Sequence, residues 1–224
     1  MKNSLKSLLL ATTAATVMTS TAAVAYEAGD ILIKGGAANV APNEDSSDVT
    51  PLAGAQGAKV DNNTQLGLTL TYMYTDKIGI ELLAATPFEH TVTATGAVIG
   101  GADVADIKHL PPTLTLNYYF GDSNSKVQPY IGAGINYTIF FDESADSQFE
   151  AIAGNTDVDL DDSWGLAFHA GIDYKLNDKW SLNAGYWYLD IDTEATLKTA
   201  NVGVQKVDVD IDPDVYMIGL SYKF

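Results

Sequence analysis

Large apolar residues alternate with small or polar residues along most of this chain, with a period of two. The last nine residues show the pattern clearly, with large apolar side chains at Tyr216, Ile218, Leu220, Tyr222 and Phe224. A period of two places these side chains on one face of a β-strand. The chain is therefore expected to end in a strand with one strongly apolar face.

Seven further segments carry the same alternation, so the sequence predicts eight strands. Their ranges are Asp30–Val40, Thr64–Thr75, Ile78–Phe88, Ile107–Phe120, Val127–Phe141, Ser163–Lys175, Trp180–Thr196 and Val207–Phe224. These strands exceed the ~5 to 6 residues common in soluble proteins and fit the ~9 to 11 residues that cross a bilayer at a tilt. The opposite face is rich in Gly, Thr and Asn, as expected for the crowded interior of a small barrel.

The connections between these strands alternate between long and short. Residues 76–77, 121–126 and 176–179 form the short ones. This order predicts an all-β fold, an eight-stranded antiparallel up-and-down transmembrane β-barrel with both termini on the periplasmic side. A soluble periplasmic barrel is the alternative, but it would face its apolar residues inward, and the bulky face is too large for that interior.

The first 25 residues have the features of a cleaved signal peptide. Lys2 and Lys6 precede an uncharged apolar stretch, and Ala23-Val24-Ala25 has the form of a cleavage site. We therefore expect an exported protein whose residues 26–224 form one barrel domain. The chain has no cysteine, which excludes disulfides and thiol chemistry.

Charge excludes some classes of partner. The formal net charge is −17, and removal of the two signal-peptide lysines leaves −19. Nucleic acid requires a basic surface, so it is not an expected partner. The chain contains no arginine, which also argues against a dedicated site for anionic substrates.

Several runs of sequence go beyond a generic barrel and resemble the outer membrane protein W (OmpW) family, in order and at the family's spacing. The runs are residues 62–72 (NNTQLGLTLTY), 80–88 (IELLAATPF), 108–114 (KHLPPTL), 119–122 (YFGD), 129–141 (PYIGAGINYTIFF), 162–165 (DSWG), 187–192 (WYLDID) and the last strand. The resemblance implies a monomeric barrel in the bacterial outer membrane, with a narrow apolar lumen for small hydrophobic molecules. It also implies that the final strand is read by the barrel-assembly machinery.

Parity places three large apolar side chains inside the predicted barrel. Leu83 follows the lipid-facing Leu82, while Trp187 and Leu189 alternate with outward tyrosines. These match positions with which the family lines and constricts its channel. The alternative is that they only fill the interior, because eight-stranded barrels are often packed shut.

Prolines interrupt two of the predicted strands. Pro87, Pro111 and Pro112 cannot donate to a β-ladder, so each strand must bulge or stop pairing there. The family resemblance implies lateral passage through the barrel wall in this region. A bulge near the rim without a transport role is the alternative.

Parity also places Glu81, His109 and His169 on the inward face. A metal site needs three or four convergent ligands, and the three histidines of the chain are far apart in sequence. We therefore expect hydrogen-bonded lumen residues, with no metal and no cofactor. The sequence has no G-x-S-x-G motif and no coherent Ser/His/acid arrangement, so an enzyme is not expected.

The long connections, notably residues 97–106 and 142–161, are expected to be loops rich in acidic residues. Their carboxylates could bind Ca²⁺ or Mg²⁺, which also bridge lipopolysaccharide, or they could form a solvated anionic rim. Asp208, Asp210, Asp212 and Asp214 alternate with apolar residues, which is typical of a barrel wall extending beyond the membrane.

The sequence thus predicts a narrow channel for passive transport of small hydrophobic or amphipathic molecules, surrounded by outer-membrane lipid and lipopolysaccharide. A structural or surface-interaction barrel, acting as a receptor or adhesin through acidic extracellular loops, is the alternative.

Overall fold

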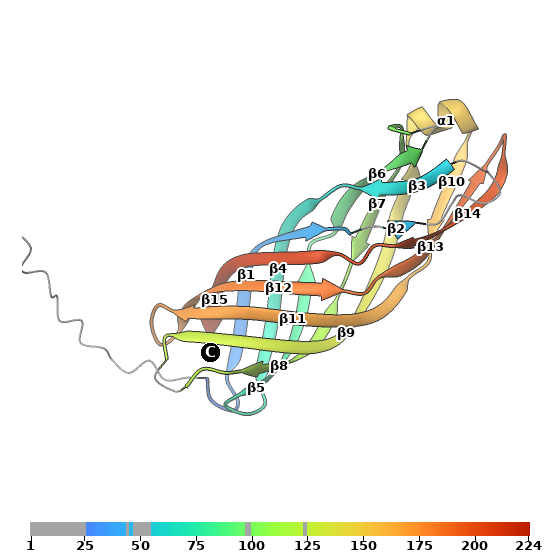
Figure 1. Ribbon diagram of the computed structural model, residues 1–224. Coiled ribbons are helices and arrows are strands. Elements are labelled where there is room, and N and C mark those ends of the chain that lie inside the picture. Colours follow the sequence, from blue (N-terminus) through green and yellow to red (C-terminus); the bar gives the residue numbers. More distant parts are fainter. Residues whose placement is uncertain (1–25, 44, 47–54, 97–99, 123–124) are drawn as a thin grey trace, which may run out of the picture.

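Eight strands of the chain close into an antiparallel barrel, which confirms the predicted fold class (Figure 1). The computed structural model describes residues 26–43, 45–46, 55–96, 100–122 and 125–224, and the predicted signal peptide lies outside them. The order around the barrel is β1 (Ile31–Ala41), β4 (Asn63–Met73), β5 (Ile78–Ala85), β8 (Thr113–Tyr119), β9 (Val127–Ala145), β11 (Ser163–Lys175), β12 (Trp180–Leu189) and β15 (Asp214–Lys223), which pairs again with β1.

The start of β1 and the end of β15 lie together at one end of the barrel, beside the short turns (Figure 1). Leu32 pairs with Lys223, and the Phe224 N–H donates to the Ile31 carbonyl. We call this the short-turn end and the opposite end the long-loop end.

The barrel is apolar on the outside and mostly polar inside. On β4, Leu68 and Leu70 are 47% and 48% exposed, whereas Thr69 and Thr71 between them are buried. The same alternation runs through β8, β11 and β12. A continuous exposed apolar belt of this kind is unsuited to water and fits contact with lipid.

Glycine makes room for large side chains in the lumen. A Cβ at Gly171 would lie 2.4 Å from the Tyr130 ring, and one at Gly185 would lie 2.7 Å from the Trp187 ring. The inward glycines therefore allow two of the largest aromatic side chains to fit inside an eight-stranded wall.

Four of the predicted strands are each divided in two, which corrects their predicted boundaries. The breaks fall between β5 and β6 (Phe88–Gly96), between β7 (Asp103–Leu110) and β8, between β12 and β13 (Asp192–Thr199), and between β14 (Gly203–Asp210) and β15. Proline occupies three of these breaks, at Pro87, Pro111–Pro112 and Pro213. Asp212 lies in the same break as Pro213, and its φ of +36° is one that an L-residue rarely adopts in a strand.

Beyond the breaks, the chain builds two sheets at the long-loop end. In the first, β3 (Ala55–Val60), β6 and β7 pair in order, and β7 pairs with the part of β9 nearest the long-loop end. The second has the order β10 (Thr156–Leu160), β13, β14 and β2 (Asp45–Ser46). We call these two sheets together the extension.

The predicted loop over residues 142–161 is wrong, because this segment is largely ordered secondary structure. It contains the end of β9, the helix α1 (Ser147–Ala153) and β10. Asp146 caps the helix by accepting a hydrogen bond from the Gln148 N–H, and Gly154 ends it with φ of +83°. Residues 103–106 likewise belong to β7, while residues 97–99 lie outside the described part. No helix within the described ranges is long and apolar enough to span a membrane.

Candidate functional site: the barrel lumen and the extension

A buried ionic cluster occupies the lumen towards the short-turn end. The Lys34 ammonium lies 3.0 Å from Glu81 and 3.8 Å from Asp173, and it donates to the Tyr130 hydroxyl at 3.0 Å. The His169 Nδ1 lies 3.2 Å from the other Glu81 oxygen. Lys34, Glu81 and Asp173 are all completely buried. Because a buried charge is stable only when paired and hydrogen-bonded, these five side chains form one interdependent unit, the ion cluster.

Tyrosines and apolar residues pack in the lumen between the ion cluster and the short turns. Tyr26, Leu32, Met73, Tyr119 and Tyr130 form one buried apolar cluster. The Tyr26 hydroxyl donates to Asp173 at 2.8 Å, which ties this layer to the ion cluster. Charges and aromatic rings together therefore fill this half of the lumen with side chains.

The predicted apolar lumen residues lie on the other side of the ion cluster. Leu83, Trp187 and Leu189 are 4%, 1% and 0% exposed and belong to the large apolar cluster of the interior. The Trp187 ring stacks on His169 with centroids 4.0 Å apart. The structure thus places Leu83, Trp187 and Leu189 inside, as parity indicated, and Glu81 and His169 beside them in the ion cluster.

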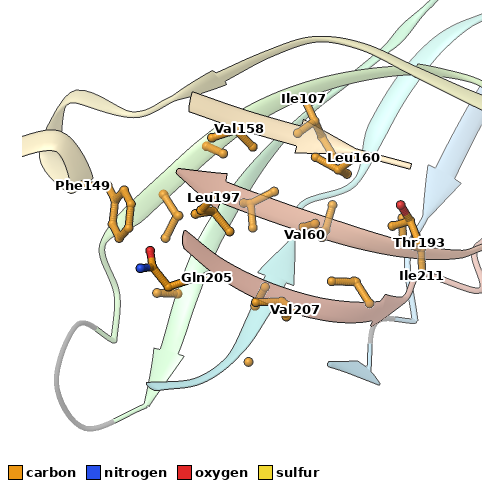
Figure 2. A pocket seen from close by; sticks show the side chains of 18 of the residues that line it. Val60, Ile107, Phe149, Val158, Leu160, Thr193, Leu197, Gln205, Val207 and Ile211 are labelled. Atoms are coloured by element: carbon orange, nitrogen blue, oxygen red, sulfur yellow. The ribbon is translucent and has the colours of Figure 1, made fainter. Parts of the chain in front are cut away.

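The apolar cluster continues from the barrel into an apolar cavity in the extension (Figure 2). The cavity has a volume of about 110 Å³. Ile107, Val207, Val209 and Ile211 line the cavity and also belong to the apolar cluster around Trp187. Val207, Val209 and Ile211 are buried and alternate with aspartates, as the sequence pattern indicates. The predicted continuation of the barrel wall is corrected, because β14 belongs to the second sheet of the extension and pairs with β13 and β2.

The few polar side chains that line the cavity are engaged elsewhere. The Thr193 hydroxyl donates to the Asp161 carbonyl, and Gln205 is hydrogen-bonded to Gly203 and Thr199. Phe149 of α1 faces the cavity from the far end (Figure 2). Sequence reasoning missed this cavity, because its walls come from segments that were assigned to loops or treated as extensions of the barrel strands.

The barrel wall is unpaired where the prolines lie. The β5–β8 ladder ends at Leu83 and Thr113, and the next pair on the same two segments is Phe88 with His109. On either side, the Thr86 N–H donates to β4, and the Pro112 carbonyl accepts from the Tyr137 N–H of β9. The chain therefore stops pairing at these prolines, as their chemistry predicts, and leaves a break in the ladder that we call the wall gap.

His109 lies on the long-loop side of the wall gap, in the extension, and not in the barrel lumen as predicted. Its Nε2 lies 3.0 Å from the Nε2 of His90, and the two rings stack. Burial lowers the pKa of His109 to about 3, and the neighbouring His90 adds to this shift. Burial also lowers the pKa of His90, and the Asp61 carbonyl and carboxylate offset part of that effect.

Acidic side chains gather at the rim where β12, β13 and β14 meet. Carboxylate oxygens of Asp190, Asp192 and Asp212 lie within 4.8 Å of one another. Asp212 already accepts hydrogen bonds from the Tyr188 hydroxyl and the Ile191 N–H. Through these hydrogen bonds, Asp212 joins the segment before β15 to the end of β12 and the residue before β13.

The final strand presents its apolar face outward. Tyr216, Ile218, Leu220 and Phe224 are 50%, 73%, 45% and 65% exposed, and Tyr222 is half-buried. This strand seals the barrel against β1 and β12. Its role as an assembly signal stays a prediction.

A closed antiparallel barrel with an apolar outer belt and a filled lumen defines the class of outer-membrane β-barrel proteins, which lie in contact with membrane lipid. Within that class, the sequence matches the OmpW family over residues 27–224, and the chain belongs to this family.

Relatives and solved structures agree with this assignment. Outer membrane protein W of Vibrio cholerae serotype O1 is 49% identical over 208 residues, covering 92% of this chain and 94% of that protein. Outer membrane protein W of Escherichia coli K12 is 47% identical, covering 98% of this chain and all of that protein. The crystal structure of OprG from Pseudomonas aeruginosa has a TM-score of 0.82 at 50% identity, covering 89% of this chain and 98% of that one.

Proposed function

We propose that the protein is a passive conduit for small hydrophobic or amphipathic molecules in the outer membrane, acting as a monomer and without a cofactor. One observation carries the proposal: an apolar interior runs from the extension cavity to Leu83 and Trp187, and then meets the ion cluster. An apolar solute would be stabilised along the first part of this path, because its transfer out of water into an apolar interior lowers its free energy.

The ion cluster determines where such a solute would leave. An apolar molecule entering it would separate paired buried charges without replacing their contacts, which is costly. Leu83 and Phe88 belong to the apolar cluster and flank the wall gap along the chain. We therefore assign the exit to the wall gap at Pro87, Pro111 and Pro112, from which a solute would enter the lipid layer.

The proposal is tested by solute flux into liposomes containing the refolded protein. Leu83→Asn and Trp187→Asp would each place a polar group on the apolar path, so flux of a lipophilic solute should fall several-fold. Heat-modifiable migration in a gel would confirm that each variant forms a barrel.

Leu32→Asn is the matched control, because Leu32 is also completely buried but lies on the far side of the ion cluster. It should leave flux unchanged if solutes leave through the wall gap. Unchanged flux in folded Leu83→Asn and Trp187→Asp would contradict the proposed path and favour a structural or surface-interaction role.

A further inference from the structure

His90 and His109 form a buried hydrogen-bonded pair at the lower edge of the β6–β7 hairpin. The two imidazoles are 3% and 5% exposed, and their Nε2 atoms lie 3.0 Å apart. His109 also packs between the rings of Phe88 and Phe140. Since Phe88 and His109 are the first paired residues above the wall gap, the histidine pair lies at its upper edge.

The surroundings assign the tautomer of both rings. His90 Nδ1 lies 2.6 Å from the Asp61 carbonyl oxygen, which only accepts, so this nitrogen carries the proton. In neutral His90 the Nε2 is then an acceptor, and His109 must donate to it through its own Nε2–H. The remaining nitrogen, His109 Nδ1, is buried and has no hydrogen-bond partner among the described residues.

This pair has no favourable position for an added proton. A proton on His90 Nε2 would set two N–H donors against each other across 3.0 Å. A proton on His109 Nδ1 would create a buried cation whose new donor has no acceptor. Either protonation therefore favours a conformation in which the rings reach water.

The charged groups nearby do not supply the missing compensation. The Asp61 carboxylate lies 3.8 Å from His90 Nδ1 and is 61% exposed, and it also accepts from the Thr91 N–H. On the outer face, Lys108 of β7 pairs with Glu89 of β6 and Asp142 of β9. The other elements packed into the same cluster contribute apolar side chains, namely Leu83 of β5, Phe140 of β9, Val207 and Val209 of β14, and Ile211.

We propose that the His90–His109 pair is a pH-sensitive latch, which holds the β6–β7 hairpin closed above the wall gap at neutral pH and releases it in acid. Its consequence for transport rests on the proposed function, whereas the opening itself does not. Burial lowers the pKa of both histidines in the closed form, so protonation favours the open form. The closed form is therefore favoured above pH 6.5 and is progressively disfavoured as pH falls below that value.

Amide hydrogen exchange of the refolded full barrel tests the latch directly. Protection factors, corrected for intrinsic exchange at each pH, would be compared at pH 7.5 and pH 5 for residues 88–92 and 105–110. With an ordinary pKa of 6.5 in the open form, His109 alone should raise the open population about thirtyfold at pH 5. The β13–β14 hairpin, which has no histidine, is an internal control whose protection should not change.

Two non-titrating variants identify the group responsible. His90→Asn with His109→Phe keeps a donor for the Asp61 carbonyl and an aromatic ring at position 109, and it should remove the pH dependence. His90→Asn with His109→Gln serves the same purpose if the first variant does not fold. His169 remains in both variants.

Equal protection of the wild-type hairpin at both pH values would overturn the latch, and so would a pH dependence that persists in the double variants. Solute flux separates the two proposals. If the hairpin opens in acid but flux of a lipophilic solute is unchanged, the latch is supported and the exit through the wall gap is not.

Discussion

Lys34 is the residue that holds the lumen together at its most charged point. It is the only lysine in contact with both Glu81 and Asp173 among the described residues, and all three are inaccessible to water. Removing the cation would leave two carboxylates buried without their main partner. A buried pair broken in this way usually costs about 3 to 5 kcal/mol, more than an intact pair contributes over an apolar substitute.

Lys34→Met should therefore lower the free energy of unfolding by about 3 to 5 kcal/mol, which would appear as a markedly lower urea midpoint. Lys34→Met with Glu81→Gln should recover part of the loss, because one of the two unpaired charges is gone. The control is Lys198→Met, whose ion pair with Asp157 is more than half exposed on both sides and contributes at most about 1 kcal/mol. Equal midpoints for Lys34→Met and Lys198→Met would show that the ion cluster is not a stabilising unit.

The sequence predicted the side of the wall for several residues but not their partners. Alternation alone was enough to place Leu83, Glu81, His169 and Trp187 inside, where the structure has them. The His90–His109 contact was missed because the two residues are far apart along the chain. The inward position of Lys34 could have been predicted from the sequence, because Lys34 alternates with the outward apolar residues of its strand.

At the scale of the elements, proline positions decide where barrel strands become extension strands. Proline has no backbone N–H to donate to a ladder, so the pairing of β5 with β8 ends at Leu83 and Thr113. That interruption was predictable from Pro87, Pro111 and Pro112. The strands beyond it were not, because a period of two continues through both the barrel and the extension and does not mark the change of sheet.

Restoring the missing donors should narrow the wall gap. Pro111→Ala with Pro112→Ala restores two N–H groups. Successive N–H groups of a strand point to opposite neighbours, and the Pro112 carbonyl already faces β9, so the N–H at position 111 becomes available to β5. We therefore expect a longer ladder and a several-fold lower flux of lipophilic solute. Pro129→Ala is the control, because Pro129 lies on the outer face of β9 near the short turns. Slower amide exchange near the gap would show that the ladder has lengthened. If flux then equalled that of wild type, the wall gap would not be the route of transport.

At the scale of the whole molecule, two compartments share one barrel. The short-turn half is filled by charges and aromatic rings, and the long-loop half holds an apolar side-chain cluster that continues to the cavity of the extension. The sequence could predict eight strands and their outward face from alternation and loop lengths. It could not predict the cavity, since that depends on how β10, β13 and β14 curve over β3, β6 and β7 (Figure 2).

A reversible seal across the wall gap tests most directly whether apolar solutes leave the barrel there. The chain has no cysteine, so Thr86→Cys with Pro111→Cys introduces a single pair at positions that would face each other if pairing continued from Phe88 and His109. Mass spectrometry would establish that the disulfide forms, and Thr86→Cys alone would control for the oxidant.

The measurement is flux of a lipophilic solute into liposomes with the pair oxidised and then reduced. We predict that oxidation abolishes most of the flux and that reduction restores it. Equal flux through the sealed and the reduced barrel would contradict exit through the wall gap.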